Sequence, residues 1–157
     1  PRLVREAPGV GEPAQAPTIE GVEPEFLARV RDGMFGVCNE PGGTTVRAGA
    51  LELVHHPETG AAVPLSEATR GWQPVQIAGK TGTAQVAALG KDVGAKKDHA
   101  WFVSYAPAYK PEIAVLALIE NVGFGGSHAA PAAKGIYEAY LVKRNPQPVT
   151  GQEVAKR

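Results

Sequence analysis

Apolar positions recur at intervals of three and four residues in two stretches of the chain, and this spacing predicts two amphipathic helices. The first begins near Pro24, which suits the first turn of a helix, and ends before Pro41-Gly42-Gly43. The second begins at Ala129, has Pro131 in its first turn, and ends before Asn145-Pro146. The apolar positions are Phe26, Leu27, Val30, Met34 and Val37 in the first helix, and Ala132, Ile136, Ala139, Tyr140 and Val142 in the second. Gly33 lies inside the first helix, where glycine is less favourable than alanine. It therefore predicts a close packing contact that a side chain would prevent.

Three apolar segments between the helices predict strands at residues 75–87, 100–106 and 112–119. The five residues from Pro107 to Pro111 separate the last two strands, and a spacer of this length fits a hairpin loop. Three antiparallel strands with a helix on one face cannot bury both faces of a sheet. We therefore expect an α/β (α+β) fold whose remaining cover comes from elsewhere, on the N-terminal side.

The other segments predict loops and turns. Residues 44–74 have no clear period, and 46–54 fit either a short strand or a short helix. His55 to Gly60 reads as a turn, and residues 89–97 and 123–127, which are rich in glycine, read as loops.

Composition and charge then exclude several classes of protein. The 157 residues carry 16 Lys and Arg against 16 Asp and Glu, so the chain lacks the positive excess of a nucleic-acid binder. One cysteine excludes an intramolecular disulfide framework. The apolar run from Ile113 to Ile119 is far shorter than the roughly 18 residues of a membrane-spanning helix. The chain opens on Pro1 without a methionine, so we expect an N-terminal part upstream.

The segment Ala78-Gly-Lys-Thr-Gly-Thr-Ala-Gln85 carries the most specific chemistry. Strand alternation places Thr81 and Thr83 on one face, where two hydroxyls can donate to one anionic group such as a carboxylate. Gly82 between them removes a side chain, so an extended peptide can approach the backbone and add a strand. Lys80 lies on the other face and adds a positive charge that favours an anion.

These residue types allow three other interpretations. A phosphate-binding loop needs glycine at position 74, which is Pro74 here, and an ordinary exposed strand remains open on the Gly-Lys-Thr triplet alone. A metal site is not supported, because the histidines and the cysteine match no ligand spacing. We instead expect His99 to pack or form hydrogen bonds within a strand. The histidines and the cysteine are His55, His56, His99, His128 and Cys38.

Lys-Thr-Gly is also the third signature of the penicillin-binding proteins and related serine β-lactamases. The chain resembles the elongation-specific branch of the class B penicillin-binding proteins, penicillin-binding protein 2, from Pro1 to about Leu141. The segments that carry the resemblance are Lys80 to Gln85, Gly43-Thr44-Thr45, Asp98 to Val103, Glu120-Asn121, Gly125-Gly126-Ser127 and Ala129-Ala130-Pro131. The resemblance implies the C-terminal portion of a transpeptidase fold, with three antiparallel strands and two flanking helices. It implies residues 1–143 as part of the transpeptidase domain and 144–157 as a polar tail.

In that family a serine forms an acyl-enzyme with a peptidoglycan stem peptide, and β-lactams acylate the same serine. By the resemblance, Lys80, Thr81, Gly82 and Thr83 bind the substrate, with Lys80 and Thr83 also catalytic. The two threonines would hold the terminal carboxylate, and the Thr83 N–H would form half of an oxyanion hole, where one donor contributes about 3 kcal/mol. The family uses no cofactor or metal.

The nucleophile is missing from this stretch. Its serines are Ser66, Ser104 and Ser127, and none begins Ser-x-x-Lys or Ser-x-Asn. We therefore expect the chain to be the closing part of a longer membrane-anchored enzyme at the extracytoplasmic face of the inner membrane, and to be inactive alone. Its implied partners are stem peptides, β-lactams, the rest of the domain and a membrane glycosyltransferase. The alternative is a non-catalytic, penicillin-recognising sensor domain of the same fold.

Overall fold

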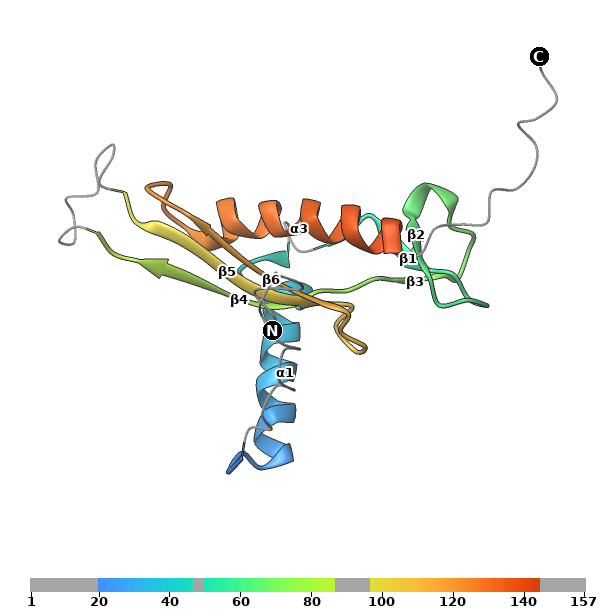
Figure 1. Cartoon of the computed structure of the whole chain (residues 1–157), viewed down its shortest axis with the longest axis horizontal. Helices are drawn as coiled ribbons and strands as arrows, with labels where there is room; N and C mark the ends of the chain where they lie inside the picture. Colours follow the sequence, from blue (N-terminus) through green and yellow to red (C-terminus); the bar gives the residue numbers. More distant parts are fainter. Residues whose placement is uncertain (1–19, 47–49, 87–96, 145–157) are drawn as a thin grey trace, which may run out of the picture.

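The computed structural model describes residues 20–46, 50–86 and 97–144, and it contains two antiparallel sheets and two long helices (Figure 1). The elements are α1 (Pro24–Asn39), β1 (Leu53–His55), β2 (Ala62–Pro64), the 3-10 helix η1 (Leu65–Glu67), β3 (Gln73–Pro74), β4 (Ala78–Ala84), β5 (His99–Ala106), β6 (Ile113–Ile119) and α3 (Gly125–Arg144). The predicted α/β (α+β) arrangement is confirmed, and a second sheet is added to it. The predictions for residues 1–19, for most of 89–97 and for the tail after Arg144 lie outside the described residues.

The main sheet has the strand order β4-β5-β6, with both pairs antiparallel. Residues 107–112 connect β5 to β6, which confirms the hairpin loop predicted at 107–111 and lengthens it by one residue. Because side chains alternate along a strand, Phe102 and Ser104 face one side of β5 while Trp101 and Val103 face the other. Phe102 and Ser104 are buried, whereas Trp101 and Val103 are exposed. The two faces of this sheet are therefore covered very differently.

Helix α3 lies along the buried face (Figure 1). Its contact surface is mostly alanine, including Ala129, Ala130 and Ala133, so the helix backbone can approach the strands closely. Tyr137 fills the larger space further along, and its hydroxyl lies 2.7 Å from the Ser104 Oγ. This hydrogen bond pairs the two hydroxyls inside the core, where an unpaired one would cost roughly 1–3 kcal/mol.

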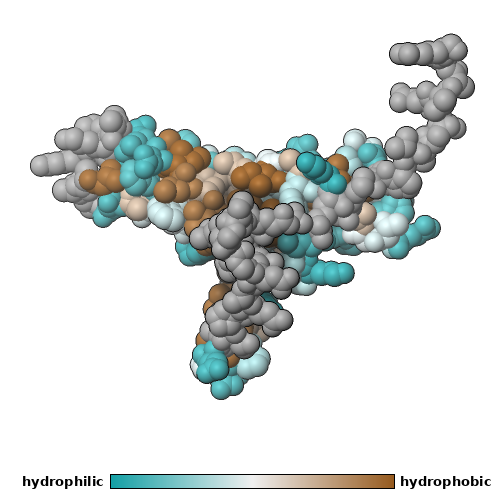
Figure 2. Space-filling view, in the orientation of Figure 1, coloured by the Kyte–Doolittle hydropathy of each residue, from teal (hydrophilic) through white to brown (hydrophobic). Residues whose placement is uncertain are grey.

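The opposite face of the sheet is largely uncovered within the described residues. Val103, Leu116 and Leu118 are 46%, 59% and 43% exposed, and they stand beside one another across β5 and β6. Figure 2 shows hydrophobic surface over the sheet and along the part of α1 that stands away from it. Among the described strands, β6 pairs only with β5, so its outer edge carries no strand partner. Apolar cover beyond the described residues is expected here.

Helix α1 begins at Pro24, as predicted, and runs away from the sheet on the side opposite α3 (Figure 1). Only its C-terminal end is buried, at Cys38. There the Asn39 side-chain amide donates to the Phe35 carbonyl and to the Ile77 carbonyl, each at 2.8 Å, and so ties the helix to the chain just before β4. The close contact expected at Gly33 is wrong for the described structure, since a Cβ placed there has nothing within 4 Å.

The small sheet, in the order β2-β1-β3, lies in the segment where no period was found. The strands β1 and β2 form a hairpin whose turn confirms the prediction at His55 to Gly60. Val54 and Val63 oppose one another in it and are both buried. Its strands are two or three residues long, too short for alternation to be visible in the sequence.

Several element boundaries differ from the predicted ones: β5 begins one residue earlier, at His99, β6 one residue later, at Ile113, and β4 ends at Ala84 rather than at position 87. Strand β4 begins at Ala78 rather than at position 75, because Gln73 and Pro74 pair with β1 instead. Helix α3 begins at Gly125, so the loop predicted at residues 123–127 is wrong for its last three residues, and Pro131 lies beyond the first turn. No helix in the described parts of the chain is long and apolar enough to span a membrane.

Candidate functional site

Strand β4 carries the predicted site residues and forms one edge of the main sheet. In its register with β5, Lys80 is opposite Val103, Thr81 opposite Phe102, Gly82 opposite Trp101, and Thr83 opposite Ala100. Residues opposite one another share a face, so Lys80 stands on the uncovered face of the sheet. Thr81 and Thr83 stand on the other face, as strand alternation predicts.

The polar groups of β4 are accessible. Lys80 and Thr83 are exposed, and Thr81 and Gly82 are half-buried. The Lys80 Nζ donates to the Thr81 backbone carbonyl at 2.6 Å, so the ammonium group folds back onto its own strand. The structure thus brings a cation and two hydroxyls together on four consecutive residues. Among the described strands β4 pairs only with β5, so the cation on one face and the two hydroxyls on the other flank an edge that carries no strand partner.

Gly82 is bordered by Trp101 on the neighbouring strand. A Cβ placed on Gly82 would lie 3.3 Å from the Trp101 Cβ, which is tighter than ordinary van der Waals contact. The glycine is therefore matched to the indole beside it within the sheet. Its predicted role in letting a peptide approach the strand stays a prediction.

A further hydroxyl joins the site from outside the strand. The Thr44 Oγ1 lies 3.0 Å from the Thr81 Oγ1, and the Thr44 side chain is exposed. Thr44 belongs to the turn after α1, and the sequence offered no reason to assign it to the site. The only available signal was its place in the Gly43-Thr44-Thr45 segment that resembles the family.

Buried hydrogen bonds hold that turn against the end of α1. The Thr45 Oγ1 donates to the Val37 carbonyl at 2.9 Å and contacts the Cys38 Sγ at 3.3 Å. The Thr45 N–H also donates to the Val37 carbonyl, at 3.1 Å. Burial raises the pKa of the Cys38 thiol, and hydrogen bonds from Thr45 and the Gly79 backbone partly offset this. A raised pKa disfavours the nucleophilic thiolate, so Cys38 acts here as a small core residue.

The start of α3 closes the other side of the turn. A Cβ on Gly126 would lie 2.5 Å from the Thr44 carbonyl oxygen, and one on Gly125 would overlap the Trp101 carbonyl oxygen. Both positions therefore require glycine for close approach of the backbones. A hollow of about 680 Å³ opens beside this junction, lined by the turn and by Ser127, Pro131 and Lys134 of α3.

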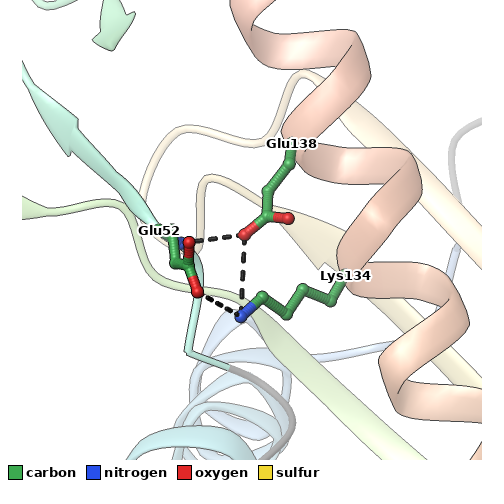
Figure 3. Close-up of polar contacts among 3 residues, drawn as sticks. All are labelled: Glu52, Lys134 and Glu138. Carbon is green, nitrogen blue, oxygen red and sulfur yellow. Dashed lines mark hydrogen bonds and ion pairs between the residues drawn. The ribbon is translucent and has the colours of Figure 1, made fainter. Parts of the chain in front are cut away.

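A surface cluster joins the small sheet to α3 (Figure 3). The Lys134 Nζ lies 3.6 Å from the Glu52 Oε1 and 3.7 Å from the Glu138 Oε1, and the Glu52 N–H donates to the Glu138 Oε1 at 2.9 Å. Accessible ion pairs of this kind contribute between zero and about 1 kcal/mol each. The cluster orients the small sheet on the helix and lies apart from β4.

The remaining candidate residues have structural contacts. The His99 Nδ1 accepts the Asn121 N–H at 3.1 Å, which confirms its expected hydrogen-bonding role. His56 packs edge-on against Trp72, with ring centroids 5.0 Å apart. Ser104 is occupied by Tyr137 in the core. Within the described residues, no three His, Cys, Asp or Glu side chains gather as a metal site would require.

Comparison with known proteins decides the family. Residues 15–138 match the family described as the penicillin-binding protein transpeptidase domain. The chain belongs to this family. A peptidoglycan D,D-transpeptidase MrdA of Haemophilus influenzae is 45% identical over 80 residues, which cover 46% of this chain and 12% of the relative. The MrdA of Salmonella typhimurium is 29% identical over 136 residues, which cover 82% of this chain and 18% of that relative.

A solved structure supports the transpeptidase-domain fold. The crystal structure of Pseudomonas aeruginosa PBP2 in complex with WCK 5153 has a TM-score of 0.58 and 29% identity, and the match covers 92% of this chain and 25% of that one. The predicted family resemblance and fold class are therefore confirmed. The matched part of this transpeptidase-family chain spans about an eighth to a fifth of the length of the two MrdA relatives.

Proposed function

We propose that this chain is the Lys-Thr-Gly portion of a peptidoglycan D,D-transpeptidase that cross-links stem peptides by serine acyl transfer. The observation that carries the proposal is strand β4. Its position at the edge of the sheet leaves Lys80 and Thr83 exposed and Thr81 partly exposed. Membership of the transpeptidase-domain family supports it. The nucleophilic serine is supplied by the rest of the same domain, since no serine here begins Ser-x-x-Lys.

In the proposed reaction, the serine oxygen attacks the penultimate D-Ala carbonyl of a stem peptide. The bond to the terminal D-Ala breaks, and the leaving amine takes a proton. An amine on a neighbouring strand then attacks the acyl-serine ester and restores the serine. Lys80 attracts the anionic end of the substrate and organises the hydrogen bonds of the site, while Thr81 and Thr83 donate to its carboxylate. Gly82 leaves room for the peptide backbone.

The Thr83 N–H supplies one half of the oxyanion hole in this proposal. A donor of this kind contributes about 3 kcal/mol to transition-state stabilisation. β-Lactams present a carboxylate beside a strained amide carbonyl, so they acylate the same serine and make the protein their target.

The resemblance to penicillin-binding protein 2 supports a role in cell elongation and cell shape. The protein would then act at the extracytoplasmic face of the inner membrane, held by an anchor outside residues 1–157, beside a membrane glycosyltransferase. We propose residues 1–143 as part of the transpeptidase domain and 144–157 as a tail.

The test uses the full-length protein, incubated with a pentapeptide stem and an amine acceptor. We expect release of D-Ala and formation of cross-linked dimers, both visible by mass spectrometry. Thr83→Val should slow both about tenfold or more, because a hydrogen bond to a charged group contributes about 1.5–3 kcal/mol. Thr69→Val, an exposed threonine on the connection between η1 and β3, is the matched control. A covalent penicillin adduct without cross-linking would instead indicate the sensor alternative.

A further inference from the structure

Thr44 lies outside β4, and its Oγ1 is 3.0 Å from the Oγ1 of Thr81, a proposed substrate-binding residue. We infer that Thr44 is a positioning residue, which donates its proton to the Thr81 Oγ1 and so turns the Thr81 proton toward the substrate carboxylate. The inference rests on the proposed function, because it needs Thr81 to bind that carboxylate. It assigns to the turn after α1 a part in substrate recognition.

The direction of the hydrogen bond follows from the number of protons. Each hydroxyl has one proton to donate and two lone pairs that accept. If Thr81 donates to Thr44, its only proton is used and the carboxylate gains nothing from it. A carboxylate is an acceptor only, so its binding selects the arrangement in which Thr44 donates to Thr81 and Thr81 donates to the ligand. Each bond in such a chain polarises the next.

The position of Thr44 is fixed by contacts on both sides. The neighbouring Thr45 is buried and hydrogen-bonded to Val37 at the end of α1. The Thr44 carbonyl lies against Gly126 at the start of α3, where no side chain would fit. Because helix ends hold the turn on both sides, the Thr44 hydroxyl is held at a set distance from β4. Little side-chain entropy of Thr44 is therefore lost when a ligand binds.

A purely structural role makes a different prediction. If the Thr44–Thr81 contact only tied the turn to β4, its loss would slow reactions with every ligand equally. If Thr44 orients a donor for the carboxylate, the loss depends on the charge of the ligand and on the presence of the Thr81 hydroxyl.

The experiment measures the second-order acylation rate constant of the full-length protein with a penicillin and with its neutral carboxamide. The variants are Thr44→Val, Thr44→Ser, Thr81→Val and the double valine variant. We expect Thr44→Val to slow acylation by the penicillin about fivefold, which is the effect of one neutral hydrogen bond. Thr44→Ser should remain within about twofold of the unmodified protein, because it keeps the hydroxyl. With the carboxamide, Thr44→Val should change the rate less than about twofold.

The double variant completes the test. Its rate with penicillin should equal that of Thr81→Val alone, because Thr44 acts only through Thr81. The inference is overturned if Thr44→Val slows acylation equally with both ligands or does not slow it at all. It is also overturned if the losses of rate add in the double variant. In each of these cases a slow Thr81→Val variant would still support the proposed role of Thr81. If Thr81→Val were itself unimpaired, both the inference and the proposed role of Thr81 would fail. The ratio of the two ligands within one variant is independent of the fraction that folds.

Discussion

Tyr137 shows how one buried hydroxyl makes the stability of the fold depend on pH. Burial raises the pKa of Tyr137 to about 12, although hydrogen bonds with Ser104 and the Val115 backbone partly oppose the shift. The unfolded chain has the ordinary tyrosine pKa of about 10. The stability that comes from keeping this phenol protonated is therefore complete below pH 10 and is lost as the pH rises toward 12.

We expect Tyr137→Phe to lower the free energy of unfolding at pH 7 by about 1 kcal/mol, the contribution of one hydrogen bond. Ser104 keeps a contact with the Val115 carbonyl at 3.4 Å, so it is not left without a partner. Above pH 10 the variant should lose less stability than the unmodified chain, since its buried ring has no proton to release. Urea denaturation at pH 7 and from pH 9 to 11.5 measures both effects. Tyr109→Phe, in a largely exposed residue, should change neither.

At the residue scale, the sequence predicted which face of β4 each side chain occupies, but it did not predict the contact of Thr81 with Thr44. Lys80 lies on one face and both threonines lie on the other because a strand has a period of two, and this follows from the motif alone. Thr44 is 37 positions away from Thr81. Their contact depends on how the end of α1, the turn after it and the start of α3 pack together, and no local pattern encodes that packing.

Among the elements, β4 and α3 depend on glycines for their close contacts. A Cβ on Gly79 would lie 2.6 Å from the Phe102 ring and 2.8 Å from the Ser104 Cβ, and both of those residues are buried. Gly135, on the exposed side of α3, has nothing within 4 Å of such an atom. The same substitution should therefore have opposite effects at the two positions.

We expect Gly79→Ala to destabilise the fold by about 1–3 kcal/mol, because the core is already filled. Gly135→Ala should stabilise it by about 0.5–1 kcal/mol, because alanine restricts the unfolded chain and favours the helix. Thermal and urea unfolding of the two variants measure these changes. Equal effects at both positions would show that the β4–β5 contact is looser than the structure has it.

The long elements could be predicted and the short ones could not. Helix α1 and the strands β5 and β6 are long enough for their periods to be visible in the sequence. The strands of the small sheet have two or three residues, and Gln73 and Pro74 pair with β1 rather than extending β4. Helix α3 begins earlier than predicted because Gly125 and Gly126, which read as loop residues, are needed where the helix start meets Trp101 and Thr44.

For the molecule as a whole, the uncovered sheet face is the main unexplained surface within the described residues. Val103, Leu116 and Leu118 form a contiguous apolar patch beside the exposed Trp101. An apolar patch of this kind marks a surface that another part of a protein covers, or one that promotes association. This exposure agrees with the prediction from the sequence that three strands and one helix leave one face of the sheet to be covered by another part of the protein.

We expect residues 1–157, expressed alone, to self-associate with increasing concentration through this face. Leu116→Thr combined with Leu118→Thr should reduce the association, since threonine keeps the strand propensity while it removes apolar surface. Sedimentation measurements across a concentration series would show the change. Leu141→Thr is the control, because that leucine lies on the buried side of α3 and its replacement should destabilise the fold rather than reduce the association.

The central claim is that β4 forms one wall of a serine transpeptidase site, and Lys80 tests it most directly. The measurement is the second-order rate constant for acylation of the full-length protein by a fluorescent penicillin, compared between the unmodified protein and Lys80→Ala. We predict a loss of about 10- to 100-fold, because a hydrogen bond with a charged group contributes about 1.5–3 kcal/mol. Lys110→Ala, an exposed lysine in the loop between β5 and β6, should leave the rate unchanged. Equal rates for Lys80→Ala and the unmodified protein would contradict the account.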